Sequence, residues 1–211
     1  MCANLKGNAR KLSTGKGDNS ARFSANFRYY VNTFSAFNTA PVTTLCSANG
    51  KVLKTLIDNS DLKAKVDADA PATIEMFEFT TSNGTKLNGY MVKPANFNAS
   101  HKYPVIMYQY SGPGSQQVQD SWSSGFMPGM IWERYLAQNG FICVCVDGRG
   151  TGGRGAEFEK QTYLKLGLLE AQDQVEAALY LGKLDYVDKD KIGIWGWSYG
   201  GFNTLMSMSE G

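Results

Sequence analysis

The residues best suited to covalent chemistry lie near the end of the sequence, in the run KIGIWGWSYGG from Lys191 to Gly201. Within it, Gly196 to Gly200 spell the pattern GxSxG, with Ser198 at its centre. A serine hydroxyl is a weak nucleophile at neutral pH, so it needs a sharp turn that exposes it to a base and to backbone N–H groups able to receive an oxyanion. The pattern therefore makes Ser198 the candidate nucleophile.

The residues around the motif favour such a turn. The run from Ile192 to Trp195 has the composition of a short buried strand, and FNTLMSM from Phe202 can continue as a helix. Gly200 and Gly201 would let this helix pack closely under a sheet. Because a short motif of this kind also occurs by chance, a structural glycine turn is the alternative interpretation.

A competing motif follows the apolar run FICVCVD. The range Gly148 to Gly153 matches GxGxxG formally, but a dinucleotide site needs a helix that begins at once and an acid at the end of the next strand. The next helical pattern begins only near Gly167, and the acid at the right distance, Asp173, lies inside it. We therefore interpret this stretch as a tight loop, in which Asp147 and Arg149 form a structural pair.

Two further residues are candidates for the same chemistry. Tyr110 follows the apolar run PVIMYQ, and its hydroxyl could donate to an oxyanion. The alternative is that this residue belongs to an ordinary turn at a strand end, without a catalytic function. His101 is the only histidine, and it precedes Ser198. In folds with a GxSxG turn the order is serine, then acid, then histidine, so we do not expect His101 to be the base.

From Pro104 onward, strand-like and helix-like runs alternate. Buried strands are predicted at 104–110, 141–147 and 192–196, and helices at 131–138 and 168–183. In the second helix the expected apolar face consists of Leu168, Ala171, Val175, Ala178 and Leu179. The pattern predicts an α/β fold with a mostly parallel sheet covered on both faces, which an antiparallel hairpin at 74–92 enters through a turn at 82–85. Ser198, Asp147 and Tyr110 would then all lie at the carboxyl ends of strands.

The first 57 residues have a different pattern, typical of β structure. The run 27–34 is rich in aromatic and β-branched residues, and Asn49-Gly50 predicts a hairpin between 43–47 and 51–56. We expect the terminal strands of a β-propeller in residues 1–57, a linker at 58–70 and an α/β-hydrolase domain in 71–211. A short helical turn in the linker would have Asn59 or Ser60 as its N-cap.

Composition narrows the function classes. The 211 residues are 43% hydrophobic with a net charge of +2, so a packed globular core is expected, whereas nucleic-acid binding and a histidine-ligated metal are not. No run is long and apolar enough to span a membrane, and the N-terminal residues do not form a signal peptide. The four cysteines lack CxxC spacing, and Cys143 and Cys145 are expected to be small core residues of one buried strand.

Several long segments match one known family in the same order. FSANFRYYVNTFS and LKTLIDNSDL are similar to a last propeller blade and its exit, YPVIMYQYSGPGSQ to a first parallel strand and its loop, VDGRGTGGRG to the next strand end, and EAQDQVEAALYLGKLDYVDKDKIGIWGWSYGG to a helix and nucleophile turn. Together they resemble the prolyl oligopeptidase family of serine peptidases. Trp197 and Tyr199 beside the serine favour the branch of that family that releases dipeptides.

The resemblance implies a function for each candidate residue. Ser198 would attack the carbonyl that follows a proline or alanine in the second position of a peptide and so release an N-terminal dipeptide. The Tyr199 backbone N–H and the Tyr110 hydroxyl would hold the oxyanion. The resemblance also implies no metal or organic cofactor, a homodimer as the parent protein, and a periplasmic or cell-surface location.

The sequence departs from the family in one respect. The family's aspartate and histidine follow the serine, and the given residues end at Gly211. We therefore expect the 211-residue polypeptide by itself to be inactive. An acylpeptide hydrolase or esterase on the same fold, and a binding module without catalysis, remain alternatives, because a fold does not fix a substrate.

Overall fold

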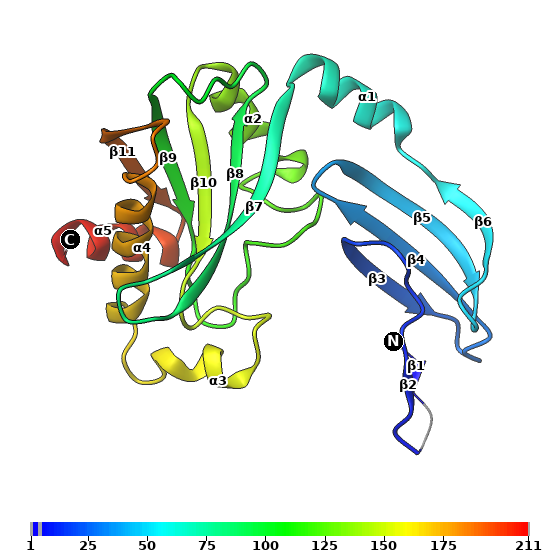
Figure 1. Ribbon diagram of the computed structural model, residues 1–211. Coiled ribbons are helices and arrows are strands. Elements are labelled where there is room, and N and C mark those ends of the chain that lie inside the picture. The colour runs from blue at the N-terminus through cyan, green and yellow to red at the C-terminus, as the bar shows by residue number, and fades with distance from the viewer. Residues whose placement is uncertain (1, 4–5, 211) are drawn as a thin grey trace. The chain divides into compact units, whose positions relative to one another are not determined.

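The computed structural model describes residues 2–3 and 6–210, and these form two compact units (Figure 1). The first unit consists of residues 1–68 and 119–124, and the second of residues 69–118 and 125–211. Each unit has its own sheet.

The sheet of the first unit is antiparallel, with the strand order β3-β4-β5-β6. Its strands are β3 (Asp18–Phe23), β4 (Tyr29–Ala36), β5 (Thr39–Ser47) and β6 (Val52–Ile57), preceded by the short pair β1 (Cys2–Ala3) and β2 (Ala9–Arg10). The hairpin predicted at Asn49-Gly50 is confirmed, with Gly50 at φ 95°. The strand predicted from Phe27 begins two residues later, because Phe27 adopts φ 55° in the preceding turn.

Helix α1 (Ser60–Asp69) is longer than the helical turn expected here. Asn59, one of the two predicted N-cap residues, directly precedes the helix, and its carbonyl accepts the Lys63 N–H at 3.1 Å. The side chain that binds the first helical residue is that of Asp58, whose carboxylate accepts both the backbone N–H and the hydroxyl of Ser60 at 3.1 Å. Val66 of this helix packs with Ala40 and with Trp122, which belongs to the segment 119–124. This cluster joins the inserted segment to the first unit.

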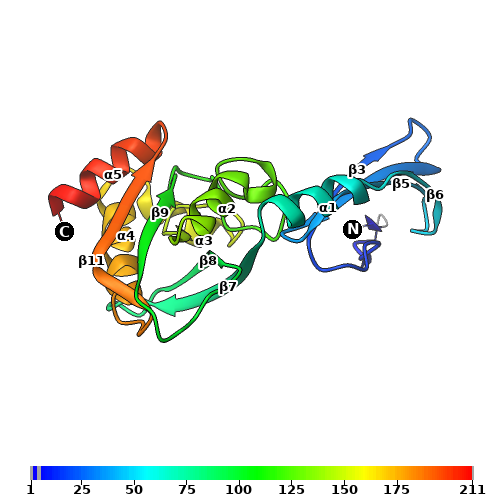
Figure 2. The same ribbon diagram turned by 90° about the horizontal axis from the view of Figure 1, so that it is seen from above.

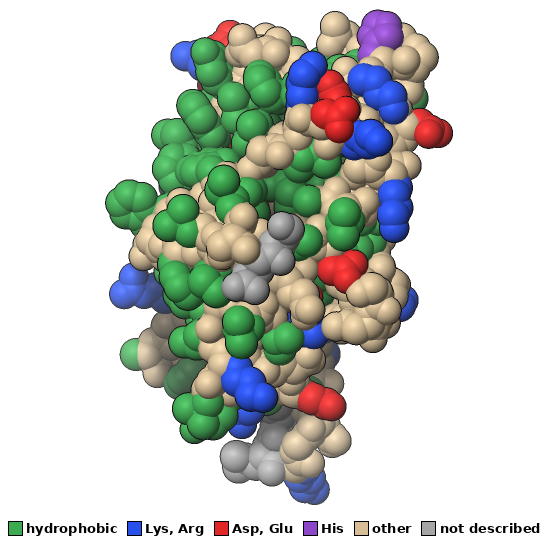
Figure 3. All heavy atoms as spheres, turned by 90° about the vertical axis from the view of Figure 1, so that its left-hand side faces the viewer, with side chains coloured by type: hydrophobic (Ala, Val, Ile, Leu, Met, Phe, Trp, Pro, Cys, Tyr) green, Lys and Arg blue, Asp and Glu red, His purple; other side chains and the backbone are tan. Residues whose placement is uncertain are grey.

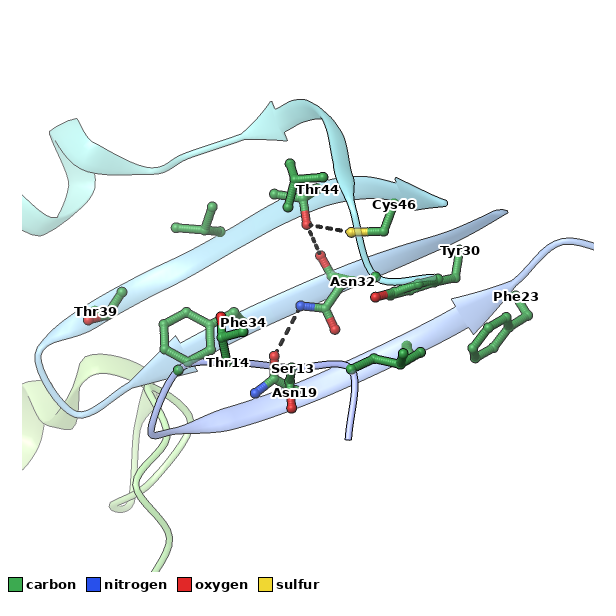
Figure 4. A pocket seen from close by; sticks show the side chains of 16 residues that line it. Ser13, Thr14, Asn19, Phe23, Tyr30, Asn32, Phe34, Thr39, Thr44 and Cys46 are labelled. Atoms are coloured by element: carbon green, nitrogen blue, oxygen red, sulfur yellow. Dashed lines mark hydrogen bonds between the residues drawn. The ribbon is translucent and has the colours of Figure 1, made fainter. Parts of the chain in front are cut away.

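A pocket of about 450 Å³ lies against this sheet (Figure 4). It is lined mainly by uncharged polar and apolar side chains, including Asn19, Asn32, Tyr30 and Cys46. The Asn32 side-chain amide donates to Asn19 at 3.1 Å. Among the described residues that line it there is no acidic, basic or histidine side chain, and its titratable groups are the Tyr30 hydroxyl and the Cys46 thiol.

The second unit holds a five-stranded mixed sheet with the order β11-β9-β10-β8-β7. Its strands are β7 (Ala72–Thr80), β8 (Lys86–Pro94), β9 (Tyr103–Gln109), β10 (Ile142–Asp147) and β11 (Val187–Gly196). The predicted entry hairpin is confirmed as β7 and β8. Strands β9, β10 and β11 are parallel to one another, while β8 pairs antiparallel with β10, so only this three-strand part has the predicted parallel arrangement.

Helices lie on both faces of this sheet. Figure 2 shows α2 (Ile131–Gln138) on one side of β9 and β11, and α4 (Leu168–Leu181) with α5 (Tyr199–Glu210) on the other. Helix α2 has the predicted bounds and is followed by Gly140 at φ 85°. Sequence analysis missed the short helix α3 (Ala156–Glu159) and the 3₁₀ turns at Pro128–Met130 and Lys160–Thr162.

The core between the sheet and α4 is apolar, but the predicted apolar face of α4 is partly wrong. Leu168 and Leu179 are more than half exposed. The buried positions of the helix include three polar residues, Glu170, Asp173 and Gln174. Gln174 donates to the Ser111 hydroxyl at 3.2 Å and to the Val146 carbonyl at 3.0 Å, while Glu170 and Asp173 accept hydrogen bonds from Tyr199 and Arg149. These polar bonds at the carboxyl edge of the sheet override the simple apolar pattern. Cys143 and Cys145 are buried and free, as predicted.

Candidate active site

Ser198 lies in the sharp turn between β11 and α5. The strand ends at Gly196 and the helix begins at Tyr199, so two residues connect them. Ser198 is exposed and has φ 55°, a left-handed conformation that costs a non-glycine residue on the order of 1–3 kcal/mol. The N–H of Gly201 donates to the Ser198 carbonyl at 2.9 Å and closes the turn. This is the strained strand–turn–helix arrangement that the motif predicts.

Glycines let this turn lie directly on the neighbouring strand. A β-carbon at Gly200 would overlap the carbonyl oxygen of Gln109 and lie 3.0 Å from Cα of Tyr110. A β-carbon at Gly196 would lie 2.5 Å from the carbonyl carbon of Gly200. The predicted close packing therefore occurs at Gly200, and the second tight position is Gly196, since a β-carbon at Gly201 would meet nothing closer than 3.3 Å.

Tyr110 lies at the same sheet edge as Ser198, because it directly follows β9, the parallel neighbour of β11. Its ring centroid is 6.3 Å from that of Tyr199. A β-carbon at Gly112 would lie 2.5 Å from the Tyr110 ring, so the ring needs a glycine beneath it. The next residue, Ser111, is fully buried at φ 59°. The loop after β9 is thus as tightly shaped as the serine turn.

The start of α5 offers a donor for an anion. The first N–H groups of a helix have no acceptor inside the helix, and the helix dipole favours negative charge there. The first residue of α5 is Tyr199, directly after Ser198. Its backbone N–H and the Tyr110 hydroxyl are therefore the two groups at this edge that could receive an oxyanion formed at Ser198.

A buried carboxylate anchors the Tyr199 side chain. Glu170, in the first turn of α4, is fully buried and accepts the Tyr199 hydroxyl at 3.0 Å and the backbone N–H of Gly167 at 2.9 Å. Burial raises the pKa of Tyr199, and the hydrogen bond to and charge of Glu170 raise it further. The tyrosine is therefore held neutral, with its hydroxyl directed away from the serine turn into the protein.

Asp147, the last residue of β10, binds the loop that Tyr110 begins. It accepts the backbone N–H groups of Gln117, at 3.1 and 3.0 Å to its two carboxylate oxygens, and of Val118 at 2.8 Å. Burial raises its pKa to about 6, and the two backbone donors and the charge of Arg154 oppose that rise. The predicted Asp147–Arg149 pair is wrong, because Asp147 uses its oxygens for this loop.

Arg149 pairs instead with Asp173 of α4. The Arg149 guanidinium donates to Asp173 from Nε at 3.0 Å to both oxygens and from Nη2 at 2.6 Å, and the Arg149 backbone N–H donates at 2.6 Å. Asp173 is fully buried and Arg149 nearly so. This bidentate pair fixes the loop after β10 on α4. Sequence proximity suggested the wrong acid, since the partner lies one loop and one helix further along the chain.

The glycines of the GxGxxG-like stretch have a packing function. The Gly114 N–H donates to the Gly150 carbonyl at 2.9 Å, and the Gly152 N–H to the Ser115 carbonyl at 2.8 Å. A β-carbon at Gly152 would lie 2.6 Å from the Gly114 carbonyl oxygen. The two loops thus lie backbone against backbone, as the interpretation of this stretch as a tight loop requires.

His101 lies at the opposite end of the sheet from Ser198. It precedes β9, in an exposed turn closed by its N–H to the Asn98 carbonyl at 3.0 Å, whereas Ser198 follows the parallel strand β11. A strand of this length spans about 20 Å. The structure therefore does not bring His101 to the serine.

No three His, Cys, Asp or Glu side chains among the described residues lie close enough to share a metal ion. No helix in this part of the chain is sufficiently long and apolar to cross a membrane.

Sequence analysis missed two polar residues that this site uses, Glu170 and Gln109. A signal existed for each. Glu170 stands three residues after Gly167, the spacing of a capping box. Gln109 is a polar residue at the end of an otherwise apolar strand, and it is completely buried.

A serine in a strained turn between a strand and a helix, at the carboxyl edge of a partly parallel sheet, is the arrangement of an α/β-hydrolase-type serine hydrolase. The model of the prolyl oligopeptidase family matches residues 129–211. Over this region the chain is similar to the prolyl oligopeptidase family of serine peptidases.

Several relatives match nearly the whole chain. It is 40% identical over 189 residues to a protein of Emericella nidulans named "Probable dipeptidyl peptidase 4", and 39% identical over 193 residues to dipeptidyl peptidase 4 of Trichophyton equinum. These alignments cover 88% and 89% of this chain but 24% of each relative. The crystal structure of Porphyromonas gingivalis dipeptidyl peptidase 4 matches with a TM-score of 0.88 and 46% identity, over 97% of this chain and 28% of that one. The chain thus spans about a quarter of the length of the proteins that it resembles.

Proposed function

We propose that the protein containing this chain is a serine exopeptidase that releases N-terminal dipeptides, with Ser198 as its nucleophile. The observation that carries the proposal is the exposed Ser198 at φ 55° between β11 and α5, beside Tyr110. Similarity to proteins named dipeptidyl peptidase 4 supports this choice of reaction.

In the proposed reaction, the Ser198 hydroxyl oxygen attacks the peptide carbonyl and its proton passes to a histidine base. The carbonyl oxygen becomes an oxyanion, which accepts hydrogen bonds from the Tyr199 backbone N–H and the Tyr110 hydroxyl. The amine leaves with the proton from the base, and water then releases the dipeptide from the serine ester. Because His101 lies at the other end of β9, the base and its aspartate come from residues of the complete protein outside this sequence.

The proposed substrate is a peptide with proline or alanine in the second position, as the resemblance implies. We also propose that the first unit is the end of a β-propeller. Its antiparallel sheet has four strands, the number in a propeller blade. A homodimer of the complete protein belongs to the same proposal.

The test uses the complete protein and three chromogenic substrates: Gly-Pro-p-nitroanilide, acetyl-Ala-p-nitroanilide and p-nitrophenyl butyrate. We expect hydrolysis of the first, with kcat lowered about a millionfold by Ser198→Ala and on the order of a hundredfold by Tyr110→Phe. Tyr163→Phe, an exposed tyrosine of the same unit, serves as the control for the hydroxyl deletion and should leave kcat unchanged.

Each other result would replace the proposal. Preference for the acetylated substrate would identify an acylpeptide hydrolase, and preference for the butyrate an esterase. Absence of hydrolysis of all three by the complete protein would indicate a binding module. Full activity of the Ser198→Ala variant would remove Ser198 from the mechanism.

A further inference from the structure

Gln109 is a buried polar residue that the proposed reaction does not use directly. It is the last residue of β9, has no exposed surface, and pairs in the sheet with Gly196, the last residue of β11. Each of these two paired residues directly precedes a part of the candidate site: Tyr110 follows Gln109, and the serine turn follows Gly196. Gln109 thus stands where the two halves of the candidate oxyanion site meet.

The Gln109 side chain binds the first two turns of α5 at three points. Its amide nitrogen donates to the Gly200 carbonyl at 2.5 Å and to the Thr204 hydroxyl at 3.0 Å. Its amide oxygen accepts from the Asn203 side chain at 3.0 Å. Asn203 is also fully buried. One side chain therefore ties the strand that precedes Tyr110 to the helix that begins with Tyr199.

Stability alone does not account for this polar bridge. The Asn203 amide oxygen is buried without a hydrogen-bond partner, which is unfavourable. Replacing both partners of a buried hydrogen bond by apolar groups of similar shape is often nearly neutral. The Gly200 carbonyl would still accept the Thr204 hydroxyl, at 2.7 Å, without Gln109. What the bridge adds is a fixed position of β9 relative to α5, because hydrogen bonds are directional and apolar contacts are not.

We propose that Gln109 is a positioning residue, which through Asn203 and Gly200 holds Tyr110 and the Tyr199 backbone N–H at the spacing that an oxyanion requires. This inference rests on the proposed function for its kinetic consequence. Donors of an oxyanion site act over a narrow distance range, so loss of the bridge should lower kcat and leave KM nearly unchanged.

The decisive comparison is between Gln109→Met and the double variant Gln109→Met/Asn203→Leu in the complete protein. The single change removes the acceptor of the buried Asn203 side-chain N–H. We therefore expect a lower urea midpoint and a kcat at least about tenfold lower. The double change leaves an apolar pair, and we expect the midpoint to return to near the wild-type value while kcat stays low. Recovery of kcat together with the midpoint would show that Gln109 is only structural and would overturn the proposal.

Two controls complete the design. Leu181→Ala removes a fully buried side chain at the other end of α4 and should lower the urea midpoint without a change in kcat. Hydrogen exchange gives a readout independent of activity: in the double variant the amides of Tyr110 and Tyr199 should exchange faster than in the wild type. Unchanged exchange would overturn the positioning role. A wild-type protein that hydrolyses no substrate but shows the exchange difference would refute the proposed function alone.

Discussion

At the scale of single residues, the site depends on buried polar side chains that hold backbone groups in place. Glu170 is one of them, since it binds the Tyr199 hydroxyl and the Gly167 N–H and has no exposed surface. Removal of such a group leaves two donors without acceptors.

We therefore expect Glu170→Ala to lower the free energy of unfolding by about 2–3 kcal/mol. Urea unfolding of the protein measures this loss. Leu179→Ala on the same helix, more than half exposed, is the matched control and should stay within about 0.5 kcal/mol of the wild type. Equal effects of the two substitutions would mean that the Glu170 bonds contribute no stability.

The sequence predicted the positions of some site residues correctly and the hydrogen-bond partners of others wrongly. Ser198 and Tyr110 could be placed at the sheet edge, because a GxSxG turn and an apolar strand followed by Tyr-Ser-Gly are local signals. The partners of Arg149 and Asp147 could not, because those bonds join loops that the chain brings together only after folding. The polar face of α4 could not be predicted either, because its partners also lie in loops that are distant in the sequence.

At the scale of elements, the ends of the parallel strands are fixed by ionic and polar bonds to loops and helices. Asp147 at the end of β10 binds the loop after β9 through the Gln117 and Val118 amides, and Asp173 of α4 binds the loop after β10 through Arg149. The two carboxylates differ in charge environment. Asp173 faces a guanidinium, whereas Asp147 has only backbone donors and the more distant charge of Arg154.

This environment of Asp147 predicts that its contribution to the free energy of unfolding depends on pH. Burial raises its pKa from 3.8 to about 6, so the folded state favours the protonated form. Below pH 3.8 the protonated Asp147 contributes about 2–3 kcal/mol to the free energy of unfolding, relative to the ionised form. This contribution is lost as the pH rises from 3.8 through 6. The free energy of unfolding of Asp147→Asn relative to wild type should therefore increase by that amount between pH 4 and pH 7.5.

The measurement is urea unfolding of both proteins at the two pH values, in which the subtraction removes all other titrating groups. Asp185→Asn, at an exposed turn between α4 and β11, is the control for a change of carboxylate to amide. A shift of the opposite sign for Asp147→Asn would mean that the three backbone hydrogen bonds outweigh burial and hold the carboxylate ionised.

At the scale of the whole molecule, the second unit has an apolar surface on α4 and α5 that is exposed among the described residues. Leu179 of α4 and Phe202, Leu205 and Met208 of α5 are all 45% exposed or more. Figure 3 shows hydrophobic side chains gathered on the face that carries β11, α4 and α5. Large apolar patches of this kind promote association.

We expect the isolated 211-residue polypeptide to associate with itself through this surface. The double change Leu205→Glu/Met208→Lys keeps good helix formers in α5 and places opposite charges three residues apart, so the helix should persist while the apolar area shrinks. Light scattering should then report a smaller average mass at the same concentration. Leu53→Glu, a similarly exposed leucine on β6 of the first unit, tests whether any added charge has this effect. If Leu53→Glu lowers the mass as much as the double change does, association is not specific to α5, and the apolar surface of the second unit is not its cause.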